Sequence, residues 1–281
     1  MAQILKGAPV AAALCERAAK ISEELRQRGV VPTLAIVRVG EREGDLSYER
    51  GAKKRCAAAG VDVKSVVFGE DVSSDEFFAR FGVLCEDKAV HGILLLRPLP
   101  ASLDGERARS MIPAIKDVDG CCDMSLAGVF TGSGCGFAPC TAEATVELLD
   151  YYNIDCDGKS VAVVGRSLVI GRPVAMLLMR RNATVTICHT HTKGLDEICR
   201  RADIVIASAG VAEMLDEKYF SANQTVIDVG VNFSEQKQKL CGDVDFDAAC
   251  PVVGAITPVP GGVGAVTSAV LALHVALAAS M

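Results

Sequence analysis

The chain has 281 residues, 50% of them apolar and 23% charged, so it can bury one large core or, as we expect, two moderate ones. The formal net charge of −6 argues against nucleic acid as the main partner, because phosphate binding needs a positive field. The twelve cysteines are dispersed without a CxxC pair and predict reduced thiols, which excludes a disulfide scaffold and argues against a metal site.

The chain begins with an apolar stretch that Lys6, Glu16 and Arg17 interrupt, and no uninterrupted apolar run reaches the roughly 18 residues of a membrane span. We therefore expect a cytoplasmic protein without a membrane partner. Short β-branched runs then alternate with stretches of helical period, which is typical of βαβ units around a parallel sheet. The first half predicts strands at 33–39, 61–68 and 90–96, and helices at about 45–59 and 74–86.

The middle of the chain, residues 116–139, is rich in Gly, Ser and Asp, has little periodicity, and is predicted to be loop. Thr141 follows as the expected N-cap of a helix that runs to about residue 152, and a domain boundary is expected near residue 140. The second half predicts strands at 160–164, 184–188, 204–208 and 225–229, and helices at 171–181, 195–201 and 265–279. The fold class is therefore α/β with two domains.

A strand-to-helix turn in the second half is the candidate dinucleotide site. The buried strand 161–164 leads into a loop between Gly165 and Gly171, and a helix then begins around Pro173. Backbone N–H groups at a helix N-terminus attract an anion, and the glycines let a pyrophosphate approach the chain. The spacing is not GxGxxG, so the pattern by itself also fits an ordinary turn of an α/β domain.

The end of the next strand indicates which dinucleotide is preferred. This strand ends without the carboxylate that binds the ribose hydroxyls in NAD-specific sites. Arg166 and Thr190 are placed to bind a 2′-phosphate instead, which favours NADP, with NAD as the alternative. His189 ends a strand and is given no acid or base role. The candidate cofactor-binding residues are Gly165, Arg166, Ser167, Gly171, Pro173, His189, Thr190, Thr192, Gly210 and Val231.

Short segments spread over nearly the whole chain form a specific pattern. They are Val39-Gly40 with Tyr48 eight residues on, Gly92-Ile93-Leu94 with Arg97-Pro98-Leu99-Pro100, 116–120, Pro139-Cys140-Thr141, 164–167, 183–189, 226–230, Gly242-Asp243-Val244 and 256–264. Together they resemble the methylenetetrahydrofolate dehydrogenase/methenyltetrahydrofolate cyclohydrolase family. The resemblance implies NADP-dependent oxidation of 5,10-methylenetetrahydrofolate to 5,10-methenyltetrahydrofolate in one-carbon metabolism.

The resemblance also implies an assembly and a division of labour. It implies a homodimer whose subunits hold tetrahydrofolate derivatives in a cleft. Residues 1–140 would form the folate-binding catalytic domain, together with a returning helix at 265–281. Residues 141–264 would form the Rossmann-type NADP-binding domain.

Physical roles can be given to the matched residues. A pterin presents an amino group beside a ring N–H, and one carboxylate, Asp119, can accept both; in the family the matching Asp does this, although an Asp-Gly pair also caps turns. Tyr48 offers a flat face and a hydroxyl, or alternatively packs on the sheet. Both residues are the candidate catalytic groups. The candidate substrate-binding residues are Tyr48, Leu96, Arg97, Pro98, Asp119, Pro260, Gly261 and Gly262.

Two departures from the family pattern affect the expected cyclohydrolase activity. Ala52 stands where bifunctional members carry a lysine one turn after the tyrosine, and Leu96 stands where they carry a glutamine. Lys53 and Lys54 lie roughly 140° and 240° around the helix from Tyr48. Hydride transfer needs no side-chain base, whereas hydrolysis needs proton transfers, so we predict a dehydrogenase with weak or absent cyclohydrolase activity.

Three other interpretations remain open at this stage. The first is a full bifunctional enzyme that makes 10-formyltetrahydrofolate, with Arg97 or a shifted Lys53 acting where Ala52 cannot. The second is a non-catalytic module that senses folate or NADP, against which the retention of both ligand sites argues. The third is a dehydrogenase for another small substrate on the same fold.

Overall fold

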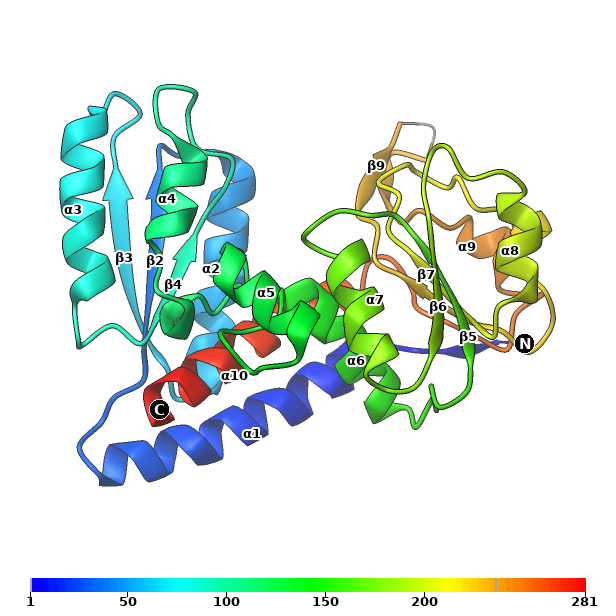
Figure 1. The fold of residues 1–281 in the computed structure, drawn as a ribbon, viewed down its shortest axis with the longest axis horizontal. Helices are drawn as coiled ribbons and strands as arrows, with labels where there is room; N and C mark the ends of the chain where they lie inside the picture. Colours follow the sequence, from blue (N-terminus) through cyan, green and yellow to red (C-terminus); the bar gives the residue numbers. More distant parts are fainter. Residues whose placement is uncertain (1, 236) are drawn as a thin grey trace. The chain divides into compact units, whose positions relative to one another are not determined.

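The computed structural model describes residues 2–235 and 237–281 and divides into two compact units (Figure 1). The N-terminal unit comprises Ala12–Cys140 and Ser268–Met281, and the C-terminal unit comprises Met1–Ala11 and Thr141–Thr267. Both units are α/β and contain a parallel sheet, which confirms the predicted fold class.

The N-terminal unit is built on a three-stranded parallel sheet in the order β3-β2-β4. Its elements are α1 (Gly7–Gln27, which starts in the other unit), β2 (Thr33–Val39), α2 (Glu43–Ala58), β3 (Asp62–Phe68), α3 (Ser74–Glu86), β4 (Gly92–Leu95), α4 (Gly105–Met111), the 3₁₀ turn η1 (Ala114–Lys116), α5 (Asp123–Thr131) and α10 (Thr267–Ser280). The three predicted strands and two predicted helices of this half are confirmed, with ends that differ by two residues at most.

The two faces of this sheet carry different helices, because side chains alternate along a strand. Phe77 and Phe81 of α3 pack on the face formed by residues such as Val37 and Leu95, in one buried cluster with α4. The opposite face carries Arg38, which is bonded to Glu49 of α2. Side chains alternate along β4 as well, and Ile93 and Leu95 face α3. Leu96, at the end of β4, therefore points to the opposite face, beneath α2.

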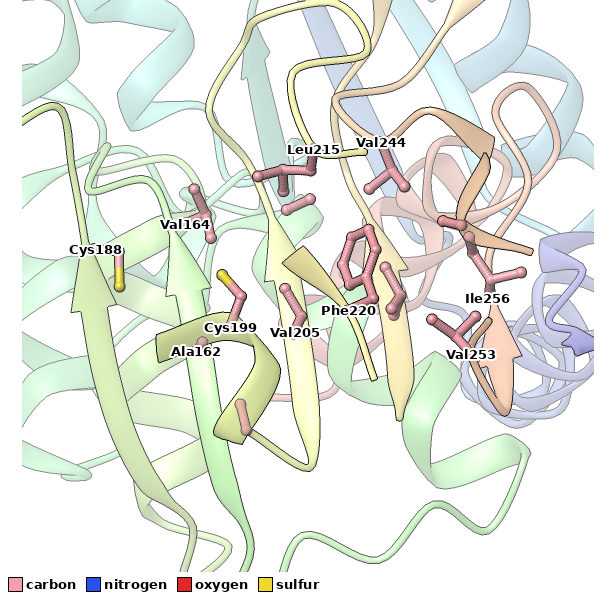
Figure 2. Packing of buried hydrophobic residues seen from close by; sticks show 14 of the residues in the cluster. Ala162, Val164, Cys188, Cys199, Val205, Leu215, Phe220, Val244, Val253 and Ile256 are labelled. Carbon is pink, nitrogen blue, oxygen red and sulfur yellow. The ribbon is translucent and has the colours of Figure 1, made fainter. Parts of the chain in front are cut away.

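The C-terminal unit contains a six-stranded parallel sheet in the order β1-β11-β8-β7-β5-β6. Its elements are β1 (Gln3–Ile4), α6 (Cys140–Tyr151), β5 (Ser160–Val164), α7 (Gly171–Met179), β6 (Thr184–Cys188), α8 (Leu195–Arg201), β7 (Ile204–Ala207), the 3₁₀ turn η2 (Glu217–Tyr219), β8 (Thr225–Asp228), the antiparallel pair β9 (Asn232–Ser234) and β10 (Lys239–Cys241), α9 (Phe246–Ala249), β11 (Ala255–Ile256) and the 3₁₀ turn η3 (Val263–Ala265). Figure 2 shows part of its core, in which side chains from β5, β7 and α8 meet Phe220 and Ile256.

The structure corrects several expectations. The stretch 116–139 contains helix α5, which Cys122 caps at its start by accepting a bond from Ser125 N, and which ends at the left-handed Gly132. Thr141 lies inside the first turn of α6 and is not its N-cap. Helices α1 and α4 were not predicted. Helix α1 is rich in alanine, leucine and glutamate, which favour a helix, so its sequence agrees with the observed structure.

The first residues of the chain also differ from expectation. They were assigned to the N-terminal domain, yet β1 pairs with β11 in the sheet of the C-terminal unit. The chain changes unit between Ala11 and Ala12, between Cys140 and Thr141, and between Thr267 and Ser268. Two residues of strand pairing suffice to recruit a terminus to a sheet edge, and the sequence Gln3-Ile4 is too short to signal it.

Residues 263–280 meet the length and composition of a membrane span, contrary to the expectation that no run is long enough. The stretch contains the polar residues Thr267, Ser268 and His274. Of this window, 61% is buried inside the protein. A helix packed in the core of a protein has the same composition.

Candidate functional site

Asp119 lies on a tight loop between η1 and α5 that is built around a second carboxylate. The fully buried Asp117 accepts hydrogen bonds from the backbone N–H of Cys121 at 3.0 Å and of Cys122 at 2.7 Å. Gly120 has φ +67°, and a Cβ there would stand 2.4 Å from the backbone of the loop before α6. The turn-forming role that the sequence left open for Asp119 therefore belongs to Asp117.

The Asp119 carboxylate faces a mixed set of groups and is 22% exposed. Its Oδ2 lies 3.6 Å from Nη2 of Arg97, and the thiol of Cys140 hydrogen-bonds to it. Burial raises the pKa of Asp119 to about 6, against the lowering influence of Arg97 and with a further increase from Asp117. At pH 7 the group is mainly ionised and can accept two N–H donors from the edge of a planar ring.

Tyr48 lies on α2 with 37% of its surface exposed, so its ring is not wholly packed on the sheet. Burial raises the pKa of its hydroxyl well above the ordinary value, and nearby Asp119 and Cys140 raise it further. The hydroxyl therefore stays protonated at neutral pH and can donate a hydrogen bond, while the ring offers a flat face. The N-terminal unit thus brings Tyr48, Asp119 and Arg97 together, with Pro98 exposed beside them.

Helix α2 is held on the sheet by the buried Glu49, the residue next to Tyr48. Glu49 binds Arg38 Nε at 3.0 Å, Ser65 Oγ at 2.6 Å and Lys53 Nζ at 2.7 Å. Burial raises the pKa of Glu49, but the hydrogen bonds from Lys53 and Ser65 outweigh it and leave the pKa below its ordinary value. This anchor was missed from the sequence, since an acidic residue early in a helix usually faces solvent.

The positions that depart from the family pattern are both apolar and buried. Ala52 has no exposed surface and Leu96 is 6% exposed. Lys53, the nearest lysine in sequence, is bound to Glu49 at 2.7 Å and is 47% exposed. The described residues thus put no lysine or glutamine side chain at these two positions, and Arg97 is the cation next to Asp119.

The predicted strand-to-helix turn of the C-terminal unit lies where the strand order reverses, between β5 and β7. Gly165 has φ +134°, and a Cβ there would stand 2.2 Å from Ser208 O at the end of β7. A Cβ on Gly171 would stand 2.2 Å from Gly165 O. Open α/β sheets bind ligands at this switch point, outside the carboxyl ends of their strands.

The loop itself leaves an exposed rim before α7. Ser167 Oγ accepts a bond from Ile170 N at 3.2 Å, which shapes the loop, and Arg166 is exposed. Pro173 is buried in the first turn of α7, where its missing N–H is not needed. The glycines and the helix start therefore form a cradle of the kind that holds a pyrophosphate.

Hydrogen bonds among its own residues hold the turn after β6. Thr192 Oγ1 accepts from His189 N at 2.8 Å, and His189 Nδ1 accepts from His191 N at 3.2 Å. Thr190 remains exposed at the tip. His189 and Thr192 are therefore structural parts of a loop that presents Thr190, and the described residues put no carboxylate between β6 and residue 193.

Two buried carboxylates that are not among the predicted site residues join the loops after β7 and β8. Asp243 accepts hydrogen bonds from Gly210 N at 3.0 Å, Val211 N at 3.1 Å and Asn232 Nδ2 at 2.9 Å. Asp228 accepts from the amides of residues 230, 243 and 244, each at 3.0 Å. Burial raises the pKa of Asp228 to about 7, against the lowering effect of those amides.

The signal for this pair was present in the sequence. Gly230 and Gly242 flank the carboxylates, and a Cβ on either would stand within 2.2 Å of a carboxylate oxygen of Asp243 or Asp228. Glycine beside aspartate in a strand-end motif indicates such close packing. We name Asp228 and Asp243 the carboxylate clasp.

Replacing Asp243 by asparagine is expected to loosen the loop that carries Gly210. The amide can accept fewer of the three N–H bonds, and a part-buried hydrogen bond to a charged group contributes about 1.5–3 kcal/mol. We expect a lower melting temperature and a KM for the dinucleotide about tenfold higher. Asp247→Asn, at an exposed carboxylate of the same unit, is the matched control, and equal KM values in the two variants would contradict the role of the clasp.

The loop 258–265 and the end of β8 line a pocket of about 360 Å³. Pro260, Gly261 and Gly262 lie in its wall together with Val231, so residues predicted for substrate and for cofactor meet here. Gly261 O accepts a bond from Gly7 N at 2.8 Å, which ties the loop to the start of α1. Among the described residues, no three His, Cys, Asp or Glu side chains gather as a metal site.

These features define a class: a two-unit α/β protein with a Rossmann-type nucleotide cradle in one unit and an aspartate-centred polar site in the other. Two family models match the chain, the tetrahydrofolate dehydrogenase/cyclohydrolase catalytic domain over residues 5–119 and the NAD(P)-binding domain of the same family over residues 139–281. The chain therefore belongs to the tetrahydrofolate dehydrogenase/cyclohydrolase family.

Individual relatives agree over their full length. The "Bifunctional protein FolD" of Carboxydothermus hydrogenoformans is 48% identical over 275 residues, which cover 98% of this chain and 96% of the relative. The crystal structure of the bifunctional methylenetetrahydrofolate dehydrogenase/cyclohydrolase from Campylobacter jejuni superposes with a TM-score of 0.95 at 33% identity, covering 100% and 99% of the two chains. The Trypanosoma brucei enzyme, solved with NADP and an inhibitor, gives 0.89 at 33% identity, covering 99% and 97%.

Proposed function

We propose that the protein oxidises 5,10-methylenetetrahydrofolate to 5,10-methenyltetrahydrofolate with NADP as hydride acceptor. The observation that carries the proposal is Asp119, a partly buried carboxylate that is ionised at neutral pH, whereas the backbone N–H groups of Cys121 and Cys122 in its loop bond to Asp117. Such a carboxylate is the group needed to accept the adjacent amino and ring N–H donors of a pterin. The family membership and the NAD(P)-binding domain support the same activity.

The residues of the N-terminal unit act by binding and orientation. Asp119 holds the pterin edge, and the Tyr48 ring offers a surface on which the pterin can lie. The nitrogen lone pairs of the substrate stabilise the cation that forms when the methylene carbon loses hydride, so no side-chain base is required. Positioning therefore accounts for most of the rate.

The C-terminal unit fits a nicotinamide dinucleotide. Gly165 and Gly171 let the turn pack closely, since a Cβ on either would stand 2.2 Å from a backbone oxygen, and this brings the start of α7 to the switch point of the sheet. When bound, the nicotinamide supplies the hydride acceptor. The Trypanosoma brucei relative, which was solved with NADP, supports this choice of cofactor.

The comparisons favour a second activity, hydrolysis of the methenyl product to 10-formyltetrahydrofolate, because the relatives are named bifunctional. The side chains favour a slow rate for that step. A buried Ala52 and a buried Leu96 offer no proton-transfer group, Lys53 is bound to Glu49, and an arginine is always charged. We infer a dehydrogenase whose cyclohydrolase step is slow, with the full bifunctional enzyme as the alternative.

Two assays on the purified protein test this function. Oxidation of 5,10-methylenetetrahydrofolate is followed by the methenyl product with NADP and with NAD in parallel, and decay of authentic methenyltetrahydrofolate is followed separately. Oxidation without faster decay supports the main proposal, and decay at the rate of bifunctional relatives establishes the alternative. Absence of oxidation with either dinucleotide would leave a ligand-sensing module or a different substrate.

Arg166→Ala tests the preference for NADP. The exposed guanidinium is expected to pair with the 2′-phosphate, so its removal should lower kcat/KM for NADP about tenfold and leave kcat/KM for NAD within twofold. The ratio of the two values is the measurement, and Arg172→Ala, at another exposed arginine near the same turn, is the control. An unchanged ratio would contradict the role of Arg166.

Assembly and location stay predictions. The unpaired edge strand β3, with the exposed Val67 on it and Val83 on α3, is the face of the N-terminal unit that we expect in a homodimer. A cytoplasmic location is expected for an enzyme of this metabolism.

A further inference from the structure

Arg97 is the one charged group of the N-terminal unit that forms an ion pair with Asp119 among the described residues. Its Nη2 lies 3.6 Å from Asp119 Oδ2, which is longer than a hydrogen bond. The guanidinium therefore balances the negative charge of Asp119, and its N–H groups stay available to bond to a ligand. Its side chain is 35% exposed, so a ligand that reaches Asp119 can also reach Arg97.

The edge of a 2-amino-4-oxopteridine has three neighbouring polar groups. The amino group and the ring N–H donate, and the C4 carbonyl oxygen beside them accepts. A carboxylate satisfies only the two donors, and a buried carbonyl oxygen without a donor costs about 1–3 kcal/mol. An arginine next to that carboxylate offers several N–H donors in a planar fork, and one of them can pair with the neighbouring carbonyl oxygen.

We propose that Arg97 is a substrate-binding residue that donates a hydrogen bond to the C4 oxygen of the pterin. Together with Asp119 it recognises the edge of the pterin that carries the 4-oxo group. The inference rests on the proposed function and adds to it a specificity determinant. In this chain α2 carries Ala52 in place of a cation, and the positive charge comes from the end of β4. Arg97 cannot transfer protons, so this charge serves binding and leaves hydrolysis slow.

The pH dependence follows from the charges around Asp119. Arg97 lowers its pKa and Asp117 raises it, and burial leaves it at about 6. Removing Arg97 raises that pKa, so more of the carboxylate is protonated at any pH near it and the acid limb of log kcat/KM moves to higher pH. The titratable or charged groups that face Asp119 are Arg97 at the end of β4, Asp117 and Cys121 on its own loop, Tyr48 on α2 and Cys140 at the start of α6.

The test compares wild type with Arg97→Leu and Arg97→Lys. For Arg97→Leu we expect KM for methylenetetrahydrofolate and Kd for tetrahydrofolate to rise about 10- to 100-fold, with KM for NADP unchanged and the acid limb shifted upward. Arg97→Lys should keep the acid limb near its wild-type position and recover part of the affinity. Arg26→Leu, which removes another arginine paired with an aspartate in the same unit, is the control.

A 4-amino analogue of tetrahydrofolate separates direct contact from indirect effects. Asp119 penalises the analogue in both proteins, so the difference between wild type and Arg97→Leu reports on Arg97 alone. We expect the variant to lose most of the remaining preference for the 4-oxo form. An unchanged preference together with an unshifted acid limb would overturn the inference, whereas a wild type that neither oxidises methylenetetrahydrofolate nor binds tetrahydrofolate would overturn the proposed function itself.

Discussion

Asp119→Asn is expected to lower kcat/KM for methylenetetrahydrofolate about 100- to 1,000-fold. The amide keeps one acceptor and turns an N–H donor toward the donors of the pterin, so both charge-assisted bonds are lost and a repulsive contact replaces one of them. Hydrogen bonds to a charged group contribute about 1.5–3 kcal/mol each, which corresponds to this loss. Steady-state kinetics with varied folate and saturating NADP give the value.

The variant should fold, because Asp117 and not Asp119 accepts the backbone bonds of the loop. Its melting temperature is therefore expected to stay close to that of the wild type. Asp123→Asn is the matched control, since Asp123 is an exposed carboxylate four residues further along the chain and pairs with Arg109. A folded Asp119→Asn protein that keeps kcat/KM within threefold of wild type would remove Asp119 from the site.

The double variant Ala52→Lys with Leu96→Gln is expected to increase methenyltetrahydrofolate hydrolysis about 10²- to 10⁴-fold. It installs a proton-transfer group one helical turn from Tyr48 and a polar partner on the face of the sheet beneath α2, and general acid–base catalysis contributes factors of this size. Hydrolysis is measured from the decay of the methenyl chromophore, after subtraction of the uncatalysed rate.

Ala57→Lys places a lysine on the opposite, exposed side of α2 and is the matched control. Ala52 is fully buried, so circular dichroism and the retained dehydrogenase rate must first establish that the double variant is folded. A wild-type rate already equal to that of bifunctional relatives would favour the alternative function and make the gain disappear. A slow wild type with no gain in the folded variant would show that these two positions do not explain the slow step.

Much of the fold could be predicted from the sequence, because buried parallel strands produce short β-branched runs with glycine-bearing turns. The strands around Val37, Ile93, Val163 and Ile206 were found in this way. The segment 123–131 could not be, since small residues such as Ser125 and Gly128 are buried while the large apolar Phe130 is exposed, so no apolar period marks the buried face. Cys122 caps the start of α5, and the left-handed Gly132 ends it.

Some residues of the candidate site could likewise be predicted from the sequence, and others could not. Tyr48, Asp119 and the glycines of the cradle are recognisable from motifs, since their chemistry is local to a few residues. The roles of Glu49 and Asp243 depend on partners distant in sequence, such as Ser65 for the former and Gly210 for the latter. No local pattern tells a buried acid with such partners from a solvated one.

By itself, the sequence determined the α/β class, the family pattern and the positions where that pattern is broken, because these depend on residue type and spacing. The tertiary structure alone decided which aspartate forms the turn and which is left for a ligand, that Lys53 is bound to Glu49, and that Arg97 lies beside Asp119. The physical reason is that burial and long-range hydrogen bonds set the charge and availability of each group, and both arise only when distant segments are packed together.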